Sequence, residues 1–242
     1  MTHNPVHTAL WERELPASRN RSTRLTPGEV AQAAFLIAES ESLWGTSVKR
    51  VANRLGVPAL RLEHYLASRE DLFDLMLDQA LAEIDLPEHN PELGWRPQLR
   101  ELADATYALA CRHPWLVELI ARPPSGPNGL RFLEQALACF DGSGLDVRSA
   151  ALAFNAVLAF VCGSVRVDTR SSAARRLGTA RDEADYLNDA VAAPSFPHLA
   201  ALFDDATDVT LDRSFTQGLD YLLDGIAERI AGGIERHRDA ED

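Results

Sequence analysis

Arg61, His64 and Tyr65 form a short stretch whose side chains could contact the edges of DNA bases. Arg61 can donate two parallel hydrogen bonds to a guanine, and His64 and Tyr65 can reach bases or phosphates. Leu62 and Leu66 lie four positions apart, so a helix here would turn both leucines inward and leave the other three side chains outside. These residue types favour sequence-selective binding of double-stranded DNA over catalysis.

Basic and small side chains around this stretch could hold the DNA phosphates. Lys49, Arg50 and Arg54 precede it and Arg69 follows it, so positive charge lies on both sides. The ordered residues that we expect to contact DNA are Ser47, Lys49, Arg50, Ala59, Leu60, Arg61, His64, Tyr65 and Arg69.

A polar segment with three arginines precedes the first predicted helix. Arg19, Arg21 and Arg24 lie within it, and basic arms of this kind can enter the minor groove of DNA. We therefore add Arg24 to the expected DNA contacts. A solvated tail without a binding role is the alternative interpretation of residues 1–24.

Capping signals define the helices that would position these side chains. Thr26 and Glu29 have the spacing of a capping box, with a proline at the first helical position between them. Ser47 begins a second helix, Gly56 ends it, and only a tight turn separates it from the third. Ser68 begins a fourth helix, expected over 71–86. The second and third helices form a helix-turn-helix, although such pairs also occur where helices only pack.

The charge of the chain is unevenly distributed. The formal net charge is −12, which taken alone argues against a nucleic-acid partner. Residues 1–72 hold nine Lys or Arg and eight Asp or Glu, a net charge of +1, which leaves −13 for the remainder. The acidity is therefore confined to the C-terminal part and leaves DNA binding by the N-terminal part open.

The rest of the chain is predicted to be helical too, so the fold class is all-α. Three prolines between positions 87 and 97 mark a break. We expect an arm over 1–24, a helix-turn-helix domain over 25–86, a linker over 87–97 and a larger helical domain over 98–242. Further helices are expected at about 98–112, 114–121, 127–141, 146–167, 198–204 and 213–236, and residues 168–197 are expected to be a loop with some helix.

Two helices of the C-terminal domain could form a dimer interface. Gly218, Gly225 and Gly232 recur every seven residues, and because glycine inside a helix costs about 1 kcal/mol, this row indicates a close helix approach. Paired with the small-residue helix over 150–165, the last helix would build a four-helix bundle between two copies, or else an intramolecular bundle. The expected interface residues are Phe154, Leu158, Gly218, Leu222, Gly225 and Ile226.

Aromatic and polar residues in the same domain could line a cavity. A helical shell of this composition suits a small, mostly apolar effector, although each residue alone is an ordinary core residue. We expect neither a metal nor a cofactor, because no second ligand lies three or four positions from His113 on the inward face. The expected ligand-binding residues are Trp95, Tyr107, His113, Trp115, Phe132, Phe154 and Asn155.

Residues 25–80 resemble the DNA-binding domain of the tetracycline-repressor (TetR) family, through Leu55-Gly56-Val57 and Ser68-Arg69-Glu70-Asp71-Leu72. Arg112-His113-Pro114-Trp115-Leu116, Gly126-Pro127-Asn128 and the glycine and leucine spacing after Phe215 resemble the C-terminal domain of the tetracycline-repressor branch. The resemblance implies a homodimeric regulator, a repressor in the first instance. Its effector would move the fourth helix and release a pseudo-palindromic operator.

Two positions depart from the family pattern. Glu63 stands where the family commonly has a phosphate-contacting tyrosine, and a carboxylate about 4 Å from a phosphate costs on the order of 1 kcal/mol. Arg69 replaces a lysine and keeps the charge. A helical dimer that binds a ligand or a protein but has lost sequence-specific DNA binding is therefore the alternative function.

Other classes fit the sequence less well. Three cysteines without zinc spacing are expected to be reduced core thiols, and no N-terminal apolar run indicates secretion, so we expect a cytoplasmic protein. The apolar stretch over 150–165 is shorter than the roughly 20 residues of a membrane span, so no membrane partner is expected. We find no nucleophile with a base and no paired carboxylates, and Gly142-Ser143-Gly144 lacks the context of a nucleotide-binding loop. An enzyme is not expected.

Overall fold

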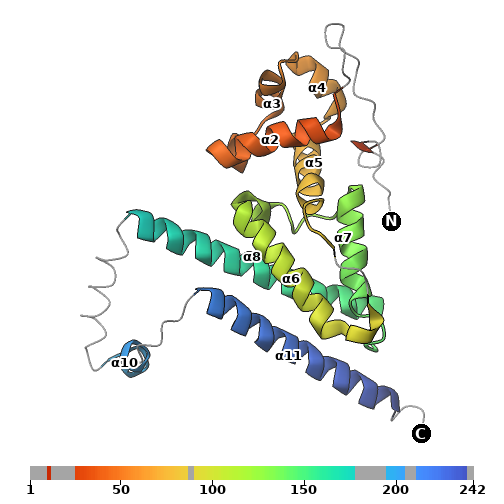
Figure 1. Ribbon diagram of the computed structural model, residues 1–242, viewed down its shortest axis with the longest axis vertical. Coiled ribbons are helices and arrows are strands. Elements are labelled where there is room, and N and C mark those ends of the chain that lie inside the picture. Colours follow the sequence, from red (N-terminus) through yellow and green to blue (C-terminus); the bar gives the residue numbers. More distant parts are fainter. Residues whose placement is uncertain (1–9, 12–24, 87–89, 178–194, 205–210, 239–242) are drawn as a thin grey trace.

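The computed structural model describes residues 10–11, 25–86, 90–177, 195–204 and 211–238 of the 242-residue chain. Every element in these ranges is a helix, and no strand occurs among them. Figure 1 shows a small N-terminal head above a larger helical body. The helices are α2 (Pro27–Glu41), η1 (Leu43–Gly45), α3 (Val48–Leu55), α4 (Ala59–Tyr65), α5 (Arg69–Leu81), η2 (Pro91–Leu93), α6 (Trp95–Arg112), η3 (Pro114–Glu118), α7 (Pro127–Ala138), α8 (Val147–Leu177), α10 (Pro197–Asp204) and α11 (Leu211–Arg238).

The predicted caps of the head are confirmed. Thr26 and Glu29 form a complete capping box, and the side chains of Ser47 and Ser68 accept backbone hydrogen bonds at the starts of α3 and α5. Gly56 ends α3 with φ of +66°, in the left-handed region that favours glycine. These local signals set α3, the turn and α4 as a helix-turn-helix.

Element boundaries differ from the sequence expectation, and the differences in α5, α6 and α8 bear on the site. Helix α5 spans Arg69–Leu81 rather than 71–86, and α6 already begins at Trp95, inside the predicted linker. Pro97 fits there because a proline in the first helical turn loses no hydrogen bond. Helix α8 continues to Leu177, past the predicted end at 167, because its last residues favour helix without apolar periodicity.

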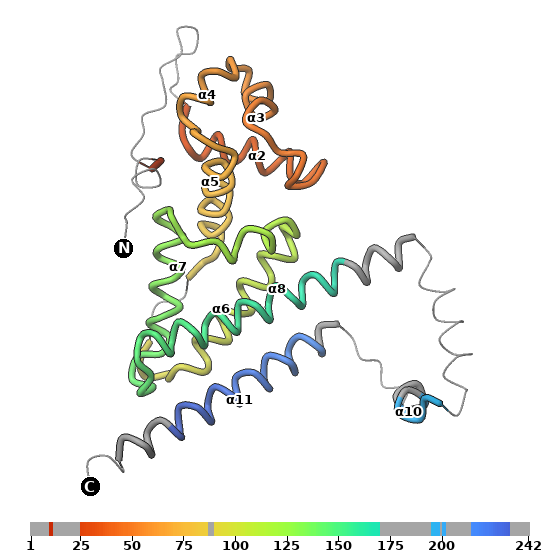
Figure 2. Tube along the Cα trace, turned by 180° about the vertical axis from the view of Figure 1, so that it is seen from behind, coloured from red at the N-terminus to blue at the C-terminus, as the bar shows by residue number. Residues whose placement is uncertain are grey.

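Helix α5 joins the head to the body. It packs on α2 at one end and on α7 at the other, as the views from opposite sides in Figures 1 and 2 show. Every residue from 71 to 78 is buried, including Asp71, Asp74 and Asp78. Buried carboxylates need partners, so α5 must be fixed by polar contacts as well as by apolar packing.

Two N-terminal residues of the predicted arm are packed. Leu10 is fully buried, and the Tyr65 hydroxyl donates a hydrogen bond of 3.4 Å to its carbonyl. Trp11 packs beside Gly126 at the joint between α5 and α7. The expectation that all of 1–24 is a free arm is therefore wrong for these two residues. Arg19, Arg21 and Arg24 lie outside the described residues.

The apolar helix α8 is longer than the sequence indicated. Residues Val147–Thr169 form 23 helical residues that by length and composition could cross a membrane, yet only 28% of the most apolar window is buried within the protomer. The apolar part of the helix is therefore longer than the stretch over 150–165, and only one of its faces, with Phe154, Val157 and Val161, is buried within the protomer. Cys111 is exposed as well, whereas Cys139 is buried and Cys162 partly buried.

Candidate DNA-binding and effector sites

Helix α4 presents a mixed face to solvent. Leu62 is fully buried, while Leu60, Glu63 and His64 are exposed and Arg61 is half-buried. Tyr65 is only 1% exposed and belongs to the core of the head. The prediction that Tyr65 contacts DNA is therefore wrong for this fold, because the side chain points away from the exposed face.

The basic residues of α3 differ in their availability. Lys49 and Arg54 are exposed, whereas Arg50 forms an ion pair with Glu41 and donates to the Gly45 carbonyl at 3.4 Å. Ser47 is half-buried, and its Oγ accepts the Arg50 amide at 3.4 Å. Its hydroxyl hydrogen remains a donor for a phosphate. Half-buried Ala59 stands at the start of α4.

Arg69 has an internal role that sequence reasoning did not predict. Its guanidinium donates to the carbonyls of Leu43 (3.3 Å) and Trp44 (2.7 Å). It also lies over the rings of Trp44 and Phe73, 5.6 and 4.9 Å from their centroids, in cation–π geometry. Arg69 therefore holds the start of α5 against the turn before α3, and its predicted phosphate contact competes with these bonds. Only a tertiary structure reveals this role.

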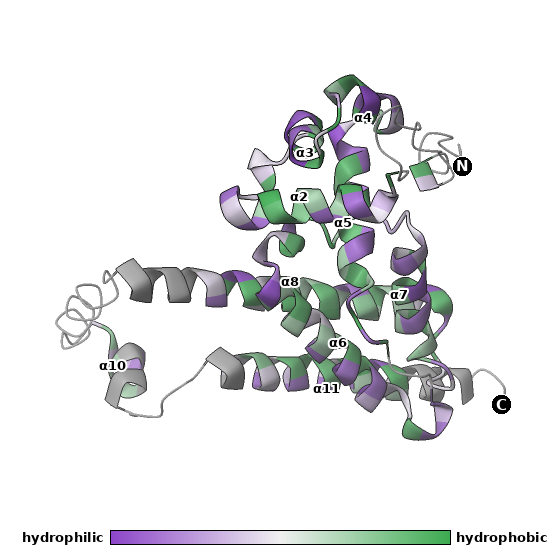
Figure 3. Ribbon diagram, turned by 45° about the horizontal axis from the view of Figure 1, so that its top comes forward, coloured by the Kyte–Doolittle hydropathy of each residue, from purple (hydrophilic) through white to green (hydrophobic). Residues whose placement is uncertain are grey.

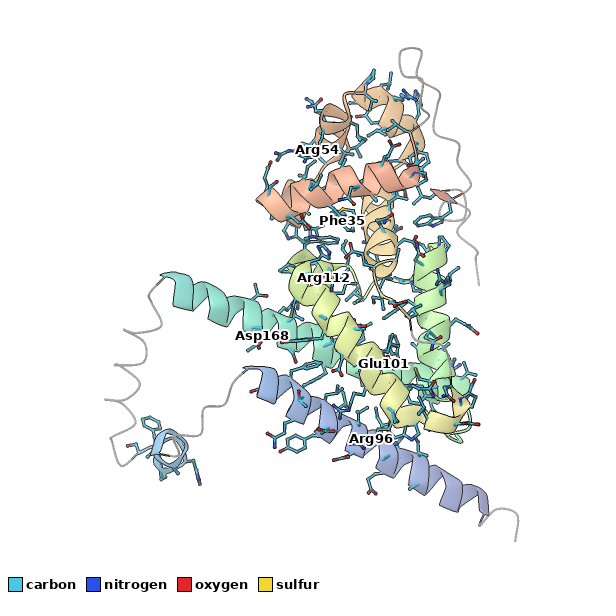
Figure 4. The ribbon with its side chains drawn as sticks, in the orientation of Figure 1. Phe35, Arg54, Arg96, Glu101, Arg112 and Asp168 are labelled. Atoms are coloured by element: carbon cyan, nitrogen blue, oxygen red, sulfur yellow. The ribbon has the colours of Figure 1, made fainter. Side chains whose placement is uncertain are left out.

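His113 lies at the junction of head and body rather than in a cavity. Its Nδ1 is 3.1 Å from Glu39 of α2, and its Nε2 is 3.1 Å from Glu83 beyond the end of α5. Its ring packs beside Phe35 and Trp115. In Figure 4, the labelled Phe35 and Arg112 mark the two facing sides of this junction. The imidazole of the body is therefore held between two carboxylates of residues 25–86, one on α2 and one just beyond α5.

The buried carboxylates of α5 bind the body directly. Asp74 accepts hydrogen bonds from Arg122 Nε (3.1 Å) and Nη2 (2.9 Å), and Glu70 accepts one from Nη1 of the same guanidinium. Burial lowers the pKa of Arg122, but the hydrogen bonds and charges of Glu70 and Asp74 outweigh this effect and raise it. Arg122 is thus positively charged, and its ion pairs with Glu70 and Asp74 hold the first half of α5 on the body.

The second half of α5 is fastened by Asp78. Its carboxylate accepts the backbone amides of Asn128 (2.8 Å) and Gly129 (2.9 Å) and the Asn128 side-chain amide (2.8 Å). These amides are the unpaired donors at the start of α7, so Asp78 caps that helix from another element. A methyl group at Gly126 would overlap Asp78 and Trp11, which explains the glycine.

A cavity of about 720 Å³ lies beside these two fastenings. Its walls come from α5, the segment after η3, α7 and α8, and most of its residues are apolar. The predicted ligand-binding residues Phe132, Phe154 and Asn155 line it. The polar side chains are Arg122, Asn155, Cys162 and Arg166, and no lining residue carries a carboxylate.

The remaining aromatic residues predicted for the ligand do not line this cavity. Trp95 stacks on Phe140, and Tyr107 stacks on Phe215 at 3.9 Å between centroids. The Tyr107 hydroxyl donates to Asp168, which Figure 4 labels on α8. Burial and this hydrogen bond raise the pKa of Tyr107 well above its usual range. Trp115 is buried at the head–body junction beside His113. Trp95, Tyr107 and Trp115 therefore hold helices together.

The outer faces of α8 and α11 leave apolar surface open. Leu152 and Val167 of α8 and Tyr221 of α11 are 65%, 56% and 66% exposed, and a second cavity of about 600 Å³ lies between the two helices. Figure 3 shows hydrophobic residues along both helices, which run side by side. A methyl group at Gly225 or Gly232 would meet nothing within 4 Å. These glycines leave room for another chain.

Several predicted dimer residues are instead used inside the protomer. A methyl group at Gly218 would lie 2.6 Å from the Phe160 ring, so this glycine serves the contact of α11 with α8. Phe154 and Ile226 are 5% and 7% exposed. Leu158 and Leu222 are half-buried and Gly225 is exposed. The close approach inferred from Gly218 is therefore intramolecular.

The fold has the architecture of a two-domain bacterial transcriptional regulator, with a DNA-binding head and a ligand-binding body. Residues 86–230 match the family model described as the tetracyclin repressor-like C-terminal domain. The chain is 32% identical over 229 residues to the transcriptional repressor DrrR1 of Streptomyces coeruleorubidus, covering 92% of this chain and 84% of that protein. It is 26% identical to the class A tetracycline repressor of Escherichia coli, covering 91% and 100%.

Solved structures agree with these matches. The structure of ActR from Streptomyces coelicolor in complex with actinorhodin has a TM-score of 0.71 and 28% identity, covering 87% of this chain and 99% of that one. The apo form of ActR gives a TM-score of 0.71 at 26% identity, with the same coverage. The chain belongs to the TetR family of ligand-responsive transcriptional regulators.

Proposed function

We propose that this regulator binds a pseudo-palindromic operator as a homodimer in the cytoplasm, represses transcription there, and is released by a small, mostly apolar effector. The observation that carries the proposal is that α5 forms one wall of the 720 Å³ cavity and directly follows α4. A ligand in this cavity therefore contacts the helix that positions the DNA-binding head. The actinorhodin complex of ActR supports an effector-binding role for the body.

The proposed dimer uses the open faces of α8 and α11. Their exposed apolar side chains and uncovered glycines are what a helical interface between two copies needs. A twofold axis there would fix the distance between two α4 helices, and this distance would select the spacing of the operator half-sites.

The proposed DNA contacts follow from exposure. Arg61 and His64 of α4 would reach base edges, with Ala59 and Leu60 in apolar contact, while Lys49, Arg54 and Ser47 would hold phosphates. Arg50 and Arg69 would act through the hydrogen-bond donors that their internal partners leave free. Glu63 on the same face would lower the affinity.

Selection of bound sequences from random duplex DNA with the purified full chain tests the proposal. We expect enrichment of one inverted repeat whose half-site centres lie about 34–36 Å apart or a multiple of it. The absence of any enriched sequence at low salt would contradict DNA recognition.

Exposed Glu63 supports a second candidate function, a dimer that binds a ligand but not a specific DNA sequence. In this case Arg61→Ala would leave DNA binding unchanged, and the weak residual binding would depend on salt alone. The two functions are distinguished by whether a sequence is enriched and by whether Arg61→Ala changes the affinity for duplex DNA at low salt.

A further inference from the structure

The polar side chains that face the 720 Å³ cavity are almost all hydrogen-bond donors. Arg122 and Arg166 line it with guanidinium groups, although Arg166 is already paired with Glu118 at 2.9 Å. Asn155 adds an amide, and no lining residue brings a carboxylate. Guanidinium groups donate and never accept hydrogen bonds. A ligand that places a negatively charged oxygen here meets complementary donors, whereas a cationic group finds only the Asn155 amide oxygen as a strong acceptor among the lining side chains.

Arg122 is shared between this cavity and α5. Of its two carboxylate partners, Asp74 is 4% exposed and accepts from Nε and Nη2, while Glu70 is 54% exposed and accepts from Nη1 alone. Displacing Asp74 would strand a buried charge, which is costly, whereas displacing half-exposed Glu70 is cheap because water can solvate it. Nη1 is therefore the Arg122 donor whose present partner a ligand displaces at the lowest cost.

We propose that the effector carries an anionic oxygen on a mostly apolar body, and that this oxygen replaces Glu70 on Nη1 of Arg122. The guanidinium keeps Asp74 and exchanges one carboxylate for another anion, so its charge stays compensated. This inference rests on the proposed function and names both the effector class and the residue through which the cavity acts on the head.

Displacement of Glu70 would affect the DNA-binding surface through residues that are directly adjacent to it. Glu70 lies in the first turn of α5, next to Arg69, whose guanidinium holds the carbonyls of Leu43 and Trp44 in the head. Losing the Glu70 contact loosens the first turn of α5, while Asp74 on Arg122 and Asp78 on α7 still hold the rest of the helix. Because an operator requires a fixed distance between two heads, a less firmly held head binds it less tightly.

The test compares two probes of nearly identical shape. Anilinonaphthalene sulfonate is an anionic fluorescent probe, and anilinonaphthalene is its uncharged parent, so the difference between their affinities isolates the charge. Arg122→Gln should lower the affinity for the sulfonate by about tenfold and leave the affinity for the parent unchanged, as expected for a lost charged hydrogen bond. Arg131→Gln, an exposed arginine on α7, is the matched control and should change neither affinity.

Glu70→Gln should change the sulfonate affinity in the opposite direction to Arg122→Gln, and it leaves the buried ion pair of Asp74 with Arg122 intact. Removing the competing carboxylate should raise the sulfonate affinity about two- to fivefold, the size expected of an exposed ion pair. On the enriched operator, saturating sulfonate should weaken DNA binding by wild type and by Arg131→Gln. The loss should be smaller in Glu70→Gln, where the contact with Arg122 is already weakened.

Three results would overturn the inference. The first is an equal affinity of wild type and Arg122→Gln for the sulfonate. The second is a loss of sulfonate binding in Arg166→Gln but not in Arg122→Gln. The third is a lower sulfonate affinity in Glu70→Gln than in wild type. The probe titrations need no DNA, so they remain decisive even if no operator is enriched. Failure of the DNA selection would then count against the proposed function alone.

Discussion

The residue that should decide DNA sequence preference is Arg61. It is half-buried on α4 between exposed Leu60 and exposed His64, so its side chain starts from a well-supported position. Its guanidinium matches the two acceptors that guanine shows in the major groove.

We expect Arg61→Ala to cost about 1–3 kcal/mol of operator binding and to relax selectivity at one base pair. Competition titrations with single-base operator variants would measure both effects. Arg131→Ala on α7 serves as the control for a lost surface charge, and an equal loss on all base variants would contradict base readout by Arg61.

Glu63 should act in the opposite direction. It is exposed on the same helix, where the phosphate backbone repels its carboxylate. Glu63→Gln should therefore strengthen operator binding by about 1 kcal/mol, with the gain largest at low salt. Binding isotherms at several salt concentrations check this, and a gain that does not depend on salt would rule out a charge effect.

At the scale of elements, α5 depends on side chains that no local pattern reveals. The capping box at Thr26 and the cap at Ser68 were predictable because the partners lie within a few residues. The pairs of Asp74 with Arg122 and of Asp78 with the start of α7 join positions about 50 apart in sequence. Periodicity can mark α5 as buried, but it cannot say which aspartate meets which donor.

The same distinction separates the candidate sites. The position of α4 and its outward side followed from the spacing of Leu62 and Leu66. Tyr65 was wrongly placed outside, because Leu10, whose carbonyl accepts its hydrogen bond, is distant in sequence. The cavity was expected in the C-terminal domain, yet His113 and Trp115 belong to the junction with α2, a contact without a sequence signal. Gly218 likewise marked a real close approach, but to Phe160 of the same chain.

The joint between α5 and α7 offers a stability test. Gly126→Ala would place a methyl group into the Asp78 carboxylate and the Trp11 ring, and we expect it to lower the free energy of unfolding by about 1–3 kcal/mol. Gly225→Ala adds the same methyl group in open space and should not destabilise the protomer. Chemical denaturation of both variants measures the difference, and equal unfolding midpoints would show that the joint is not tightly packed.

At the scale of the whole molecule, α8 and α11 expose four large hydrophobic side chains, Val147, Leu152, Val167 and Tyr221. A helix as apolar as Val147–Thr169 is stable in water when its open face is covered by protein. A second copy fits this need, because the two helices combine exposed apolar side chains with glycines that have open space around them.

We expect the double variant Leu152→Asp, Val167→Asp to be folded and monomeric, and to lose operator binding because a monomer contacts one half-site. Leu130→Asp, at a similarly exposed leucine on α7, should remain dimeric. Analytical ultracentrifugation gives the oligomeric state and circular dichroism the fold. A double variant that stays dimeric would place the interface elsewhere.

The distribution of the four tryptophans gives the protein its own optical reporters. Trp11 and Trp115 lie where the head meets the body, whereas Trp44 is exposed on the head and Trp95 stacks within the body on Phe140. Movement of the head away from the body would expose Trp11 and Trp115 to water and shift their emission to longer wavelengths. Trp44 and Trp95 would keep their surroundings. Head movement could thus be followed in real time without an attached dye.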